Sequence, residues 1–115
     1  LGDFYDLGEK TVEALSSTLG IEATLVKPYF ASGVDQNLLD NLVKDHDVIV
    51  TIEDGIIEGG WGQNIASYLG TSSARVLNYG VKKAFYDRVN IAELMRESHL
   101  ESELIAADVK QVLGL

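Results

Sequence analysis

The residues best suited to chemistry lie in one acidic, glycine-rich stretch near the middle of the chain. Glu53 and Asp54 are followed by Glu58 and then by the run Gly59-Gly60-Trp61-Gly62. Glycines at the start of a helix leave N–H groups free, and together with the helix dipole these can bind an anion such as phosphate. A carboxylate at the end of a strand can also serve as a functional acid. This stretch is therefore the first candidate for a ligand site.

The same residues also have a structural interpretation. The three acids would repel a phosphate, and the chain has neither the Lys-Ser/Thr of a P-loop nor a G-x-G-x-x-G run. The glycines can instead let a helix approach a strand closely. Glu53 can cap the N-terminus of that helix, where a negative charge is favourable. We predict the structural role for the glycines, and a capping or interface role for Glu53.

Other candidate groups are weaker. Asp45-His46-Asp47 has metal-binding residue types, but consecutive residues at a helix–strand junction point in different directions. His46 and the isolated His99 are therefore predicted to be solvated loop histidines. The sequence holds no G-x-S-x-G run and no cysteine, so neither a serine elbow nor a thiol nucleophile is predicted. The basic and aromatic run 82–88 is predicted to be a solvated edge.

The elements that position the acidic stretch are a strand before it and a helix after it. Val48 to Ile52 is apolar or β-branched without alternation, which is typical of a strand buried on both faces of a parallel sheet. Trp61, Ile65 and Leu69 fall on one face of a helix that Gly70 ends. In an open α/β sheet, the loop at the carboxyl end of a strand is where ligands or partners usually bind.

The rest of the chain repeats this alternation of helices and strands. Asp35 is the predicted N-cap of the second helix. Further helices are predicted at 7–19, 36–44, a short one after Asn90, and 102–113, with strands at 23–26 and 75–79. Such an order predicts a parallel sheet with right-handed crossovers, in one three-layer α/β/α domain that covers residues 1–115.

Composition excludes several classes of function. The 115 residues carry 18 acidic and 9 basic side chains, for a net charge of −9, which argues against binding to nucleic acid or an anionic membrane. No apolar run approaches the roughly 18 residues that a membrane helix needs. The absence of cysteine excludes disulfides and is consistent with a cytoplasmic location.

The acidic stretch also carries a family resemblance. Val50 to Gly62 resembles the V-T-x-E-[ED]-x-x-x-x-G-G-[FW]-G signature of the transketolase C-terminal domain, and it is most similar to the 1-deoxy-D-xylulose-5-phosphate synthase family. The resemblance covers essentially the whole chain. Further segments agree in order and spacing: Ala23–Val26 with Phe30 and Val34-Asp35, Val76–Gly80 as V-L-N-x-G, and Leu100 with Ile105 as the closing G-L-x-x-x-x-I.

The resemblance implies a modest role for this piece. Intact members use thiamine diphosphate and magnesium to join pyruvate to glyceraldehyde 3-phosphate with loss of carbon dioxide. Their N-terminal and middle domains hold both cofactors, and the third domain packs on them and helps form a homodimer. The resemblance thus implies no cofactor, metal or catalytic residue here, and no activity for the isolated fragment. It implies structural or interface roles for Glu53, Asp54, Gly59, Gly60, Trp61 and Gly62.

The resemblance further implies a mostly parallel sheet whose central strand ends at Leu1-Gly2. Most of that strand is missing from the sequence. We therefore expect a fragment of a longer enzyme, with a sheet that is shortened or completed by another chain.

Two alternatives remain open at this stage. Within the same superfamily, the chain could come from transketolase itself or from the β subunit of a 2-oxo-acid dehydrogenase. From another class, it could be a stand-alone flavodoxin-like binding or receiver module, in which Glu53 and Asp54 form an acidic, magnesium-binding pocket.

Overall fold

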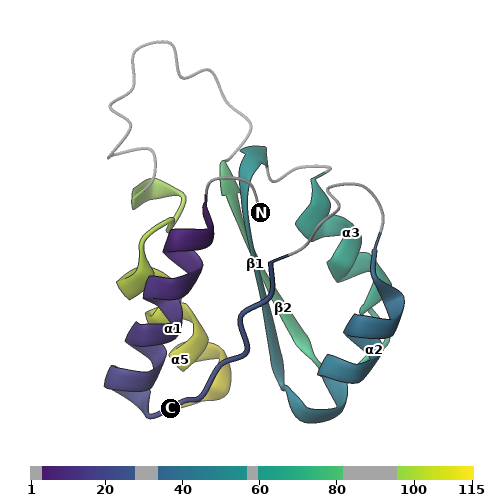
Figure 1. The fold of residues 1–115 in the computed structure, drawn as a ribbon, viewed down its shortest axis with the longest axis horizontal. Coiled ribbons are helices and arrows are strands. Elements are labelled where there is room, and N and C mark those ends of the chain that lie inside the picture. The colour runs from purple at the N-terminus through teal and green to yellow at the C-terminus, as the bar shows by residue number, and fades with distance from the viewer. Residues whose placement is uncertain (1–3, 28–33, 57–59, 82–95) are drawn as a thin grey trace.

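The computed structural model describes residues 4–27, 34–56, 60–81 and 96–115. The elements in chain order are α1 (Tyr5–Leu19), α2 (Gln36–Asp45), β1 (Val48–Ile56), α3 (Trp61–Tyr68), β2 (Arg75–Val81) and α5 (Ser102–Leu113). Figure 1 shows the strands in the middle of the molecule with helices to either side. The predicted helix after Asn90 and the basic run 82–88 lie outside the described residues.

The sheet in the described ranges consists of β1 and β2, which pair in parallel. Val48 lies opposite Arg75 and Ile52 opposite Tyr79, and the register becomes irregular between Ile52 and Ile56. The two strands were predicted from their continuous apolar runs. β1 continues past the predicted end into the acidic stretch, so Glu53 belongs to the strand.

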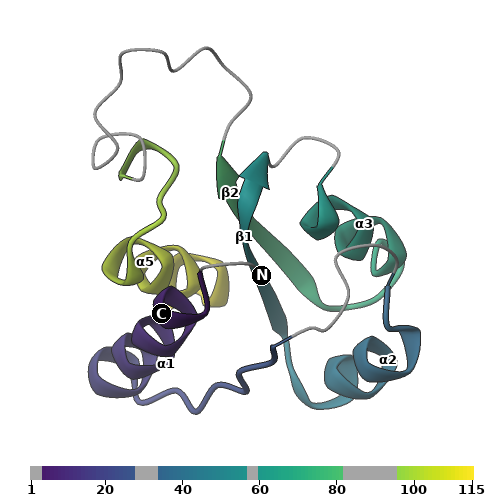
Figure 2. The same ribbon diagram turned by 45° about the horizontal axis from the view of Figure 1, so that its top comes forward.

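Helices cover both faces of this sheet, which gives the predicted α/β/α layers (Figure 2). One buried cluster joins α1 to α5 and packs against Val50, while a second joins α2 to α3 and packs against Ile49. Neighbouring residues of a strand point to opposite faces, so β1 contributes to both clusters. The two clusters are Leu15, Ala106 and Val109, and Leu39, Ile65 and Leu69.

A third cluster anchors the segment that leads into α5. Leu100 and Ile105 are 1% and 0% exposed and pack with Tyr79 of β2. These are the two residues of the closing family pattern. Their burial fixes the start of α5 on the carboxyl-terminal half of β2.

Helix ends follow the local sequence. The Asp35 carboxylate accepts a hydrogen bond from the Leu38 N–H at 3.1 Å, which confirms the predicted N-cap of α2. Gly20 ends α1 in the left-handed region at φ +65°, where glycine is the favoured residue. No helix of the described ranges is long and apolar enough to cross a membrane.

The predicted strand at 23–26 is wrong. Residues 21–27 form neither a helix nor a strand, although Ile21 and Ala23 pack against the α1–α5 cluster. A β-prone segment becomes a strand only when a neighbouring strand supplies the ladder. No described strand lies beside this segment. Whether a central strand ends at Leu1-Gly2 falls outside the described residues.

Candidate functional site

Glu53 lies at the carboxyl end of β1 and binds the N-terminus of α3. Its two carboxylate oxygens accept hydrogen bonds from the main-chain N–H groups of Trp61, at 3.0 Å, and Gly62, at 3.4 Å. The residue is 5% exposed. This contact is the helix-capping alternative of the sequence analysis, formed between residues eight and nine positions apart.

The contact also decides what else α3 can bind. A free helix N-terminus attracts anions because its N–H groups lack partners and carry the positive end of the dipole. Here the chain's own carboxylate takes these donors. A phosphate would have to displace a buried negative charge, so the glycine run is not arranged as a phosphate cradle.

Gly62 brings α3 into direct contact with the sheet. A Cβ atom at this position would lie 2.5 Å from Thr51 Oγ1 and 2.9 Å from Asn78 Oδ1. The Thr51 hydroxyl donates to the Asn78 side-chain oxygen at 2.6 Å, which ties β1 to β2 beneath the helix. Only glycine fits there without moving this pair. Sequence reasoning missed the pair, although both residues stand in the family segments.

The other motif residues are only partly described. Gly60 is the N-cap of α3 with an extended backbone, and the partly buried Trp61 packs against the α2–α3 cluster. Gly59 and the side chain of Asp54 lie outside the described part of the chain. The described motif residues therefore contribute packing and capping rather than an open pocket.

His46 is not the solvated histidine that the sequence suggested. Its Nδ1 lies 2.9 Å from the Leu42 carbonyl oxygen, and its Nε2 lies 3.0 Å from Thr24 Oγ1. A carbonyl oxygen only accepts, so Nδ1 must carry the proton. His46 thus links the end of α2 to the segment 21–27. Within the described ranges, no three potential metal ligands come together.

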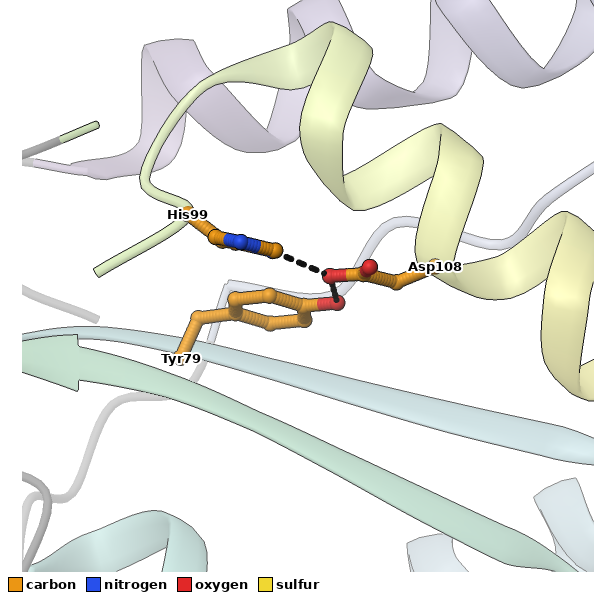
Figure 3. Close-up of polar contacts among 3 residues, drawn as sticks. All are labelled: Tyr79, His99 and Asp108. Carbon is orange, nitrogen blue, oxygen red and sulfur yellow. Dashed lines mark hydrogen bonds and ion pairs between the residues drawn. The ribbon is translucent and has the colours of Figure 1, made fainter. Parts of the chain in front are cut away.

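His99 lies in a turn with its side chain 50% exposed, as predicted for a solvated loop histidine, but it also has a polar partner. Its Nδ1 lies 2.9 Å from Asp108 Oδ2, and the Tyr79 hydroxyl donates to the same oxygen at 2.7 Å (Figure 3). His99 has φ +57°, in the left-handed region that favours glycine. In the family pattern G-L-x-x-x-x-I, His99 stands at the glycine position. That substitution was the available signal that His99 has an unusual setting.

Asp108 keeps Tyr79 in its neutral form. Burial raises the pKa of the Tyr79 hydroxyl well above its usual range, and the hydrogen bond and negative charge of Asp108 raise it further. The group joins β2, the segment before α5 and α5 itself. Since a neutral phenol donates to the carboxylate, the arrangement suits a structural tie better than acid–base chemistry.

A shallow hollow of about 260 Å³ lies at the opposite end of the strands. Asp47 and Arg75 line it together with the end of α5. The Arg75 guanidinium donates a hydrogen bond to the Val112 carbonyl oxygen and so links β2 to the end of α5. None of the motif residues reaches this hollow.

The family model for the transketolase C-terminal domain matches residues 2–105. The chain belongs to the transketolase C-terminal domain family. Glu53, Gly62 and Asn78 of this transketolase C-terminal domain are thus signature residues that bond or pack inside it.

Three curated relatives share one name. The chain is 39% identical to 1-deoxy-D-xylulose-5-phosphate synthase of Pseudoalteromonas translucida over 82% of its length, and 33% identical to that of Colwellia psychrerythraea over 93%. It is 36% identical to that of Leifsonia xyli over 99%. These matches span 16%, 17% and 18% of the relatives, so the transketolase C-terminal domain described here corresponds to a small part of each.

Replacing the capping carboxylate should loosen α3. Glu53→Gln keeps the shape but removes the charge and turns one acceptor into a donor that faces N–H groups. We expect a loss of about 1–2 kcal/mol in the free energy of unfolding. Urea unfolding can be followed by the fluorescence of Trp61, the single tryptophan of the chain. Glu13→Gln, on the exposed side of α1, is the control; an equal loss there would contradict the capping role.

A methyl group at position 62 should be poorly tolerated. Gly62→Ala places its Cβ against Thr51 and Asn78, and we expect a loss of about 1–3 kcal/mol in unfolding free energy. In the double variant with Thr51→Ala, the nearest clash is gone. Its loss, measured by the same urea titration, should be smaller than the sum of the two single losses. Strict additivity would show that Gly62 does not act through this contact.

The buried Tyr79 should make the domain sensitive to alkali. Because the folded state raises the pKa of Tyr79 above its usual value of 10.0, the unfolded chain ionises first and stability falls as pH rises above that value. Tyr79→Phe should flatten this fall, measured as the unfolding free energy between about pH 8 and 11. Tyr68→Phe, at the surface beside Asp40, should leave most of it. A fall that is unchanged by Tyr79→Phe would exclude Tyr79 as its cause.

Proposed function

We propose that the chain is the C-terminal assembly domain of a 1-deoxy-D-xylulose-5-phosphate synthase. That enzyme transfers a two-carbon unit from pyruvate to glyceraldehyde 3-phosphate with loss of carbon dioxide, for isoprenoid and thiamine precursor synthesis. The family match over residues 2–105 and the shared name of the relatives support this assignment. The same name favours the synthase over transketolase or a 2-oxo-acid dehydrogenase β subunit.

The observation that carries the assembly role is the internal use of the signature. Both carboxylate oxygens of Glu53 accept hydrogen bonds from the start of α3. Thr51 and Asn78 bond to each other beneath Gly62. An active site needs polar groups that remain available to substrate, whereas these residues stabilise the packing of helix on sheet. The motif thus marks a scaffold, and the chemistry belongs to other parts of the enzyme.

The described residues do not fit thiamine diphosphate. Its diphosphate would need free donors, and those at the start of α3 are already held by a buried carboxylate. We assign thiamine diphosphate and magnesium to the N-terminal and middle domains of the intact enzyme. This assignment also sets aside the acidic binding module, since Glu53 faces α3 instead of an open pocket.

The partners follow from the same proposal. Residues 1–115 form one domain that packs on the N-terminal and middle domains of a cytoplasmic homodimer. The charge of −9 on so short a chain favours a protein partner with basic or neutral contact surfaces over nucleic acid.

Reconstitution tests this function. The chain would be mixed with a Pseudoalteromonas translucida synthase truncated before its own C-terminal domain, and mass and carbon dioxide release from pyruvate with glyceraldehyde 3-phosphate would be measured. We expect a complex of both pieces with restored activity. The relative's own C-terminal domain serves as the positive control.

Calorimetry on the chain alone completes the test. We expect no heat of binding with magnesium or with thiamine diphosphate plus magnesium. Binding by the chain alone, or no complex where the relative's own domain forms one, would overturn the assembly role.

A further inference from the structure

Two opposite charges line the hollow at the starts of β1 and β2 without bonding to each other. Asp47 and Arg75 both contribute to its wall, and the end of α5 contributes another side. Figure 1 shows these three element ends at the same end of the molecule. In the described part of the chain, neither side chain forms an ion pair with a group of opposite charge. The hollow therefore presents one positive and one negative group that a ligand can use.

The Arg75 guanidinium is held in place and keeps N–H donors for a ligand. Its hydrogen bond to the Val112 carbonyl oxygen fixes the side chain beside the hollow. A guanidinium carries five N–H donors in a planar fork, so this bond uses only part of them. The fork matches a carboxylate, which it can bind with two parallel hydrogen bonds. Because the side chain is already ordered, binding costs little further conformational entropy.

Asp47 adds a second requirement for the ligand. Its main-chain carbonyl oxygen accepts from the Arg75 N–H at 2.9 Å, while its side-chain carboxylate is exposed at the hollow. A carboxylate attracts an ammonium group and repels a second anion. A ligand with a negative charge alone would also be repelled by the net charge of −9. A ligand that carries both charges is attracted by both side chains.

The rest of the lining limits the size and polarity of the ligand. Half-buried apolar side chains of Val48, Val112 and Leu113 line the hollow, and Ser73 adds a hydroxyl group. The volume of about 260 Å³ is below the roughly 300–1,000 Å³ of usual ligand pockets, so the ligand must be small. A carboxylate, an ammonium group and a short apolar side chain on one small molecule describe an α-amino acid.

We propose that this hollow binds a free α-amino acid with a branched apolar side chain, such as leucine. Its carboxylate binds the Arg75 guanidinium, its ammonium group binds the Asp47 carboxylate, and its side chain packs on Val48 and Leu113. The bound amino acid would join the starts of both strands to the end of α5. The site lies at the opposite end of the strands from the family signature, and it does not rest on the assembly role.

A ligand series on the unaltered chain tests the two charges separately. L-leucine would be compared with 4-methylpentanoate, which lacks its ammonium group, and with 3-methylbutylamine, which lacks its carboxylate. Binding would be followed by NMR through the amides of Ser73, Arg75 and Leu113. We expect a Kd of about 1 mM for leucine, since a shallow hollow covers few ligand atoms. Each truncated probe should bind about tenfold more weakly, because it loses one charge-assisted contact.

A matched pair of variants tests the role of Asp47. Asp47→Asn keeps the shape of the side chain and removes its charge, so leucine should bind about tenfold more weakly, no better than 4-methylpentanoate. Asp45→Asn makes the same change in net charge at an exposed position outside the hollow, and it should leave leucine binding unchanged. The ligand series needs no substitution, so it remains decisive if a variant fails to fold.

Four results would overturn the proposal. The first is no shift of these amides at leucine concentrations well above the expected Kd. The second is equal affinity for leucine and 4-methylpentanoate, which would make the hollow a plain carboxylate site. The third is an equal loss in Asp45→Asn and Asp47→Asn, which would assign the effect to net charge. The fourth is leucine-dependent shifts centred on Trp61, at the other end of the strands, instead of on the hollow.

Discussion

The buried carboxylate of Glu53 is the contact on which the arrangement of sheet and α3 depends. Burying a charge is costly unless hydrogen bonds replace the lost water. Glu53 obtains them from two N–H groups at the positive end of a helix, which is a charge-assisted contact. The strand end and the helix start are thereby held together, and α3 can cover its face of the sheet along with α2.

The close approach of α3 to the sheet is the second constraint, and it explains why the signature has a glycine at position 62. Gly62 lets α3 rest on the Thr51–Asn78 pair, so the helix, β1 and β2 meet at one point. A motif of acids and glycines after a strand invites a catalytic interpretation. Here Glu53 bonds to the start of α3, and Thr51 bonds to Asn78, so these polar groups have partners inside the domain.

On the face of the sheet that α1 and α5 cover, hydrogen bonds to Asp108 link the elements. Tyr79 and His99 share one oxygen of Asp108, which joins β2 to α5 above the buried Leu100 and Ile105. His99 occupies a left-handed backbone position that costs a non-glycine residue about 1 kcal/mol. Its bond to Asp108 offsets part of that cost.

Local patterns in the sequence were enough to predict β1, β2, α1, α2, α3, α5 and the Asp35 cap, because each depends on residues within a few positions. The capping role of Glu53 was predictable as one of two alternatives, since an acid at the end of a predicted strand was followed, across a glycine-rich turn, by a predicted helix start. The strand at 23–26 failed because a ladder needs a neighbour that local sequence does not show. His46 was misread for the same reason, because its partner Thr24 lies 22 positions away. His99 is exposed as predicted, but its partner Asp108, 9 positions away, was missed. Only the packing of helices on the sheet brought those side chains together.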